Sequence, residues 1–175
     1  MPEIDFMSAL HRSTSRNYLE RVNDPDFPKA KAAKLAKQFG FDYWDGDRLI
    51  CYGGYQYLEG RWEKVARAMA EHYELPDNPK ILDIGCGKGY LLYDFLKIYP
   101  KAIIHGLDIS EYAVSNCKPE IRSQLQVGNA TSLPWPDNYF DLVISITTMH
   151  NLYAYELITA LAEMERVSKA NKYLC

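Results

Sequence analysis

Cysteine is scarce in this sequence and is not arranged to bind a metal ion. The four cysteines are Cys51, Cys86, Cys117 and Cys175, and no two have the Cys-x-x-Cys spacing. Without such pairs or a histidine at ligand spacing, neither a zinc site nor a disulfide framework is indicated. We expect a reduced, cytoplasmic protein with no bound metal ion.

Long apolar runs and an excess of positive charge are also absent. No 18 consecutive residues are apolar, and residues 1–5 lack a basic region followed by an apolar stretch, so nothing indicates membrane insertion. A formal charge of −3 gives no general attraction for nucleic acid or an anionic membrane. With 175 residues and 47% hydrophobic content, the chain suits one core, and we expect a small-molecule partner.

The first third of the chain looks like an addition to the main fold. Residues 8–38 are polar and helix-prone, and the prolines of segment 24–28 predict two short helices. Residues 39–60 are rich in aromatics and glycine without a sustained period, which favours an ordered loop or lid. We therefore predict an N-terminal helical and aromatic extension over 1–60 and a ligand-binding domain over 61–175.

A regular alternation of strands and helices follows a helical pattern at residues 62–73. Predicted strands cover 80–84, 102–109, 124–128 and 140–146, with another beginning at 172, and predicted helices cover 90–99, 111–117 and 155–168. This order indicates an α/β fold of three layers, with a parallel sheet covered by helices on both faces. Ligands of such folds bind outside the carboxyl ends of the strands.

A glycine-rich loop follows the first of these strands. Gly85, Gly87 and Gly89 leave room for a ligand to approach the backbone, and Asp108 ends the next strand 108 − 89 = 19 residues later. A carboxylate at roughly 20 residues typically binds ribose hydroxyls, although Asp108 would also suit a helix N-cap before Ser110. A dinucleotide site would need glycine at position 90, where Tyr90 stands. An adenosine ligand without pyrophosphate is indicated.

Several motifs together resemble the class I S-adenosylmethionine-dependent methyltransferases, in particular their type 11-like members. They are ILDIGCGKG at 81–89, GLDIS at 106–110, GNA at 128–130 and LPWPDNYFD at 133–141. The resemblance implies a Rossmann-like fold and methyl transfer from S-adenosylmethionine, which leaves S-adenosylhomocysteine. By the same resemblance Asp108 binds the ribose and Ile109 packs on adenine. Asn129 stands where the family often has an aspartate that accepts from the adenine amine, with the backbone of Ala130 alongside, and its amide oxygen can still accept. The methionine part falls to the loop residues Asp83, Gly85, Cys86, Gly87 and Gly89.

Residues for the chemistry are less sharply indicated. His150 follows the fourth strand, so it is either a general base at the ligand-binding edge or a structural residue before the next helix. Tyr52 and Tyr55 would close over the sulfonium, with Tyr55 near the reaction, or they are ordinary packing. Arg61 would pair with an anionic group of the cofactor, or it lies on the surface.

The acceptor is suggested only by a second resemblance. Segments 52–55 (YGGY) and 60–62 (GRW) are similar to a bacterial methyltransferase subgroup from surface-polysaccharide biosynthesis, which implies a sugar or capsule phosphoramidate acceptor.

Class I methyltransferases usually have seven strands, whereas this sequence stops in the fifth, so we expect missing C-terminal strands, an uncovered strand edge and a homodimer. Three functions stay open: a methyltransferase, a cofactor-binding module without activity, and a nucleotide-binding Rossmann enzyme.

Overall fold

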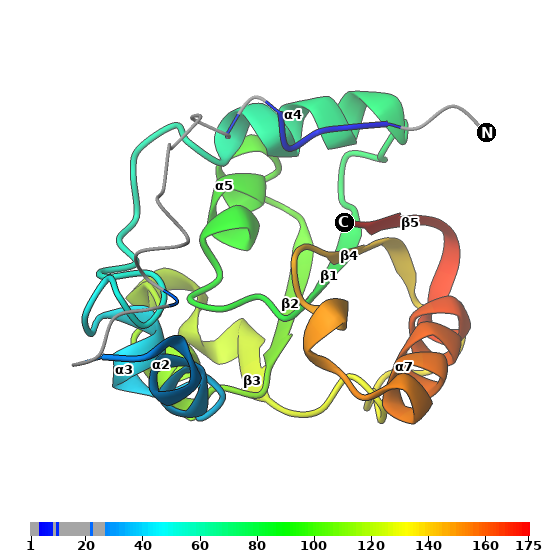
Figure 1. The fold of residues 1–175 in the computed structure, drawn as a ribbon. Coiled ribbons are helices and arrows are strands. Elements are labelled where there is room, and N and C mark those ends of the chain that lie inside the picture. The colour runs from blue at the N-terminus through cyan, green and yellow to red at the C-terminus, as the bar shows by residue number, and fades with distance from the viewer. Residues whose placement is uncertain (1–3, 9, 11–21, 23–26) are drawn as a thin grey trace. The chain divides into compact units, whose positions relative to one another are not determined.

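The computed structural model describes residues 4–8, 10, 22 and 27–175. The chain divides into two compact units, one running from residue 10 to 57 and the other containing residues 58–175 together with the first nine (Figure 1). Each unit is described by itself. The first of the two predicted N-terminal helices lies outside the described residues.

Aromatic packing orders residues 39–55, which belong to the smaller unit. Trp44 is buried, and Tyr52 stacks on it with ring centroids 5.2 Å apart and an interplanar angle of 1°. Tyr55 lies 4.8 Å from the Tyr52 ring, and the Trp44 indole N–H donates to the Phe39 carbonyl at 3.2 Å. The aromatic segment is thus ordered, but it begins with a short helix where only a loop was expected. The described helices of this unit are α2 (Lys29–Ala36) and α3 (Phe41–Trp44).

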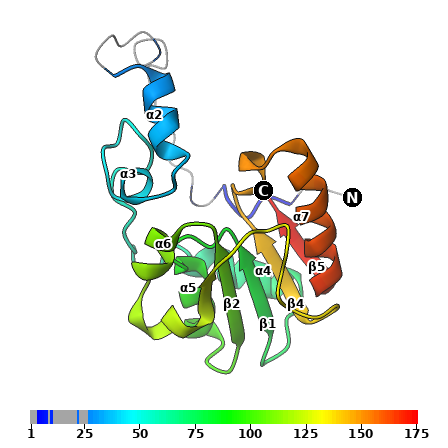
Figure 2. The same ribbon diagram turned by 90° about the horizontal axis from the view of Figure 1, so that it is seen from below.

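The larger unit is built on a sheet of five parallel strands. In chain order they are β1 (Lys80–Ile84), β2 (Ile103–Asp108), β3 (Leu125–Val127), β4 (Phe140–Ser145) and β5 (Ser168–Leu174). In space the order is β3-β2-β1-β4-β5, and every neighbouring pair is parallel. Figure 2 shows β2, β1, β4 and β5 side by side. The predicted parallel sheet is confirmed.

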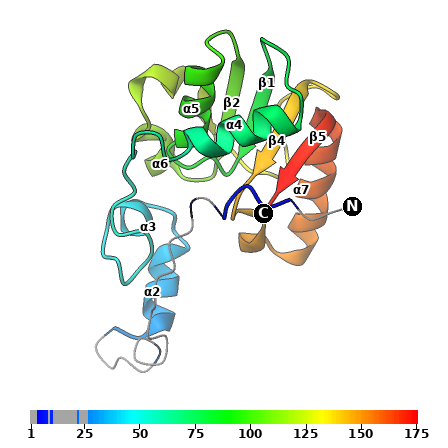
Figure 3. The ribbon, with the colours of Figure 1, turned by 90° about the horizontal axis from the view of Figure 1, so that it is seen from above.

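Helices cover both faces of this sheet. Helices α4 and α5 lie on one face and α7 on the other (Figures 1 and 3). The helices of this unit are α4 (Glu63–His72), α5 (Tyr90–Ile98), α6 (Glu111–Ser115) and α7 (Ala154–Val167), with 3₁₀ turns at η1 (Pro119–Gln124) and η2 (Met149–Asn151). Within the described residues, none of the helices is long and apolar enough to cross a bilayer.

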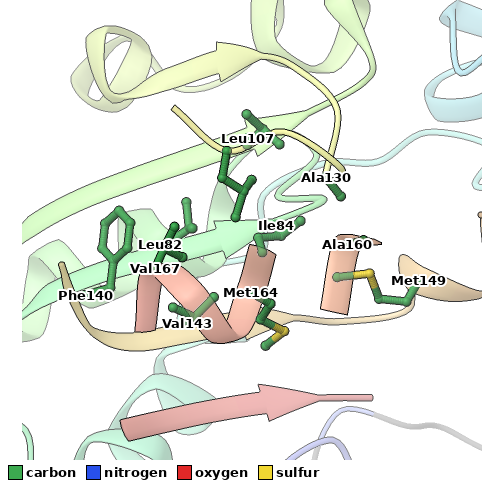
Figure 4. Close-up of a cluster of buried hydrophobic side chains, with 11 residues drawn as sticks. Leu82, Ile84, Leu107, Ala130, Phe140, Val143, Met149, Ala160, Met164 and Val167 are labelled. Carbon is green, nitrogen blue, oxygen red and sulfur yellow. The ribbon is translucent and has the colours of Figure 1, made fainter. Parts of the chain in front are cut away.

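The core between α7 and the sheet is continuous and apolar (Figure 4). Leu82 and Ile84 of β1 point toward Met164 and Val167 of α7, and all four are at least 97% buried. β1 is covered on its other face as well, so four of its five residues are buried, as expected of a central parallel strand.

β5 begins four residues earlier than predicted. Ser168 is already extended, so α7 turns directly into the strand without a loop. The pairing of β5 with β4 has an irregularity between Phe140 and Leu142, where Ser168 and Asn171 are the partners. This irregularity breaks the two-residue alternation by which a strand is recognised in a sequence.

Candidate functional site

The site is at the carboxyl ends of three neighbouring strands. β1 has β2 on one side and β4 on the other, so the direction of strand succession reverses at β1. The segments that leave β1, β2 and β4 therefore meet at one edge of the sheet, the place where open α/β sheets bind ligands.

The glycine loop leaves β1 with a backbone that only glycine adopts easily. Gly85, Gly87 and Gly89 have φ angles of 78°, 56° and 70°. A Cβ atom added to Gly85 would lie 2.0 Å from the Thr148 hydroxyl oxygen, closer than any real contact. The amides of Gly85 and Cys86 both donate to the Leu107 carbonyl, at 2.7 and 3.1 Å. The loop is thus packed between the segment after β4 and the end of β2.

Asp108 is fixed against this loop. Its Oδ2 accepts a hydrogen bond from the Gly87 amide at 2.7 Å, and its Oδ1 accepts from the Ser110 amide at 2.8 Å. Burial raises the pKa of Asp108, and these two bonds oppose that shift. Each carboxylate oxygen keeps acceptor capacity for a ligand hydroxyl. The N-cap of α6 is Ser110, whose Oγ accepts from Ala113, so Asp108 does not serve as the cap.

Asp83 adds a second buried carboxyl group beside the loop. Burial, with a smaller effect from the charge of Asp108, raises its pKa to about 7. A cation bound nearby would favour the ionised form of both groups. Glycine backbone and two carboxyl groups together suit a ligand with positive charge and hydroxyl groups.

Cys86 occupies the middle of the loop as a buried thiol. Burial raises its pKa, and the neighbouring carboxylates Asp83 and Asp108 raise it further. A thiol with a raised pKa is a poor nucleophile. Cys86 therefore serves the loop as a small packed side chain.

No group of three metal-ligating side chains occurs in the parts of the chain that are described.

The expected adenine side is formed by Ile109 and the segment after β3. Ile109 is 52% exposed, which leaves an apolar side chain free to contact a planar base. The Asn129 amide oxygen accepts from both the amide and the hydroxyl of Thr131, each at 3.0 Å, so its acceptor capacity is used within its own segment. Ala130 is buried. The role of Asn129 toward adenine stays a prediction.

The segment after β4 approaches the glycine loop closely. Ser145 donates from its buried hydroxyl to the Ile84 carbonyl at 3.0 Å, which ties the end of β4 to the end of β1. Thr147 has a φ of 50°, an unusual conformation for a β-branched residue. Thr148 touches Gly85, and His150 follows in η2 with an exposed side chain. Sequence reasoning did not assign roles to Ser145 and Thr148, because their contacts depend on the adjacency of β1 and β4.

The remaining predicted residues are two tyrosines of the smaller unit and one arginine before α4. Tyr52 and Tyr55 belong to the unit of residues 10–57, where their rings pack on Trp44. Arg61 is an exposed residue in the turn before α4. Their proposed roles toward a cofactor stay predictions.

Comparison with known proteins identifies relatives for the larger unit. A model of the methyltransferase domain (Methyltransf_11) matches residues 82–175. The demethylmenaquinone methyltransferase of Symbiobacterium thermophilum is 33% identical over 125 residues, which are 66% of this chain and 49% of that protein. The mitochondrial arginine-hydroxylase NDUFAF5 of Rattus norvegicus is 33% identical over 110 residues, 61% of this chain and 31% of that protein.

A solved structure is similar over more than half of this chain. The YcgJ protein of Bacillus subtilis gives a TM-score of 0.51 at 26% identity and covers 59% of this chain and 45% of its own. This chain spans about half or less of the length of each relative named.

Proposed function

We propose, from the premise that this chain belongs to the methyltransferase domain family, that it transfers a methyl group from S-adenosylmethionine to a small-molecule acceptor. The fold is the Rossmann-like class I fold of that family, and S-adenosylmethionine is the methyl donor that the family implies. The single observation that carries the proposal is the Asp108 carboxylate held against the Gly87 amide at 2.7 Å.

The residues present fit this cofactor. S-adenosylmethionine carries a sulfonium and an ammonium group, and the loop is flanked by the carboxyl groups of Asp83 and Asp108. Ribose hydroxyls would donate to Asp108, and Ile109 would lie against the base. When bound, the cofactor supplies a methyl group on a positively charged sulfur.

The protein's task is to align the acceptor with this methyl group, to exclude water from the site and to take a proton from the acceptor. Displacement at a methyl group needs alignment more than covalent help from the enzyme. His150, exposed in η2 just after the Thr148 contact with Gly85, would accept the proton of a hydroxyl acceptor on a ring nitrogen. A sugar or phosphoramidate acceptor stays within the proposal, and no described residue selects it over another hydroxyl compound.

Activity assays with labelled cofactor test this function. The protein is incubated with methyl-tritiated S-adenosylmethionine and a panel of quinols, sugars and carboxylic acids, and labelled product is measured. His150→Ala should retain cofactor affinity and lose about 10² to 10⁴ in kcat, the usual contribution of a general base. Unchanged kcat with an accepted substrate would reassign His150 to a structural role.

A cofactor-binding protein without methyl transfer is the second candidate. The specific reason is the relative whose name is that of a hydroxylase, which matches over 110 residues. Binding of S-adenosylmethionine without labelled product from any acceptor of the panel would favour this second candidate.

A further inference from the structure

The segment between β3 and β4 has no regular secondary structure, yet its backbone is held in place. It begins at Asn129 and Ala130, the expected adenine side of the site, and continues to Tyr139. Two side chains of α7, Glu163 and Arg166, bind it at positions between 133 and 137. Isolated loops of this length need such contacts to keep one conformation.

Arg166 uses every N–H group of its guanidinium. Nη1 donates to the Trp135 carbonyl at 2.8 Å and to the Asp137 carboxylate at 2.9 Å. Nη2 donates to the Leu133 carbonyl at 2.9 Å and to Glu163 at 2.8 Å, and Nε donates to Glu163 at 2.7 Å. Since a guanidinium has five N–H donors and an ammonium has three, lysine would not reproduce this arrangement.

Glu163 completes the arrangement. Its Oε2 accepts from the Leu133 amide at 2.7 Å, so both backbone polar groups of Leu133 are bound to α7. The side chains of Arg166 and Glu163 are 31% and 20% exposed. Hydrogen bonding to Arg166 lowers the pKa of Glu163, which is therefore charged at neutral pH. The contact is a charge-assisted clamp on backbone groups, and it differs from an exposed surface ion pair.

We propose that Glu163 and Arg166 are positioning residues that hold segment 129–139 in the conformation that binds the adenine end of the cofactor. This inference rests on the proposed function, because that function places adenine beside Asn129 and Ala130. Neither side chain touches the cofactor in this account. Their effect is on the fraction of molecules in which the segment is ready to bind.

Calorimetric titration of the whole chain tests the proposal with two probes, S-adenosylhomocysteine and methylthioadenosine. Methylthioadenosine lacks the amino acid part but keeps the adenosine. Arg166→Ala should weaken both by the same factor, about tenfold if the binding-competent fraction falls to about a tenth. Glu163→Gln should weaken both to a smaller degree, and Arg166→Lys should not restore the wild-type Kd. Arg67→Ala, which removes a similar glutamate–arginine pair from α4, is the matched control and should bind as wild type.

Several readouts separate positioning from a loss of folding. Unfolding lowers the binding stoichiometry, whereas positioning raises Kd at unchanged stoichiometry. Amide hydrogen exchange of segment 129–139 without ligand should be faster in Arg166→Ala than in Arg67→Ala. If wild type binds and both Arg166→Ala and Glu163→Gln bind with the wild-type Kd, the positioning role is overturned while the proposed function stands. If wild type binds neither probe, the proposed function itself is refuted.

Discussion

Replacement of Gly85 by alanine is the perturbation whose effect on stability follows most directly from the structure. The new Cβ atom would lie 2.0 Å from Oγ1, 2.4 Å from Cγ2 and 2.6 Å from Cβ of Thr148. The position also has a φ of 78°, where an L-residue costs about 1–2 kcal/mol. Overpacking adds about 1–3 kcal/mol, so Gly85→Ala should destabilise the fold by roughly 2–5 kcal/mol.

Gly60→Ala separates the two contributions. Gly60 has a φ of 70°, and no atom lies within 4 Å of an added Cβ, so this variant should show the backbone cost alone. Urea denaturation of both variants measures the free energy of unfolding, with the m-value as a check on two-state behaviour. Because the Thr148 Cβ is itself in the way, adding Thr148→Gly to Gly85→Ala should recover more stability than adding Thr148→Ala. Equal destabilisation by Gly60→Ala and Gly85→Ala would refute the proposed contact between the loop and the β4 segment.

Two further predictions concern residues beside the loop. Burial raises the pKa of Asp83 to about 7, so the folded state holds the proton more tightly than the unfolded state, and stability should fall as pH rises from about 4 to 7. Asp83→Asn should flatten this part of the stability–pH curve, measured by denaturation at several pH values, and an equally steep curve in the variant would contradict the assignment. Thr147→Gly should raise stability by about 1 kcal/mol, because Thr147 has a φ of 50° and an exposed side chain. A lower melting temperature for that variant would show that its backbone is not strained.

Most of the larger unit was predictable because its signals are local. Apolar runs and helical periods marked β1 to β4 and α4 to α7 to within a few residues. β5 was placed too late, since its first residues are polar and its pairing with β4 is irregular near Ser168. The turns η1 and η2 have too few residues to show a period.

The candidate site was predictable where recognisable motifs and the spacing between them mark it. The glycine loop and Asp108 follow from sequence spacing, and the structure brings them together through the Gly87 amide. The contact of Thr148 with Gly85 and the binding of Leu133 by Glu163 join residues far apart in sequence. Such contacts depend on strand order and helix packing, which a single sequence does not specify residue by residue.

The central claim is that this chain binds S-adenosylmethionine through the glycine loop and Asp108. The direct test is calorimetric titration of wild type and Asp108→Ala with S-adenosylmethionine, S-adenosylhomocysteine and NAD. The account predicts that wild type binds the first two in preference to NAD and that Asp108→Ala loses this binding while remaining folded. Binding of NAD alone, or an unchanged affinity for S-adenosylmethionine in Asp108→Ala, would contradict it.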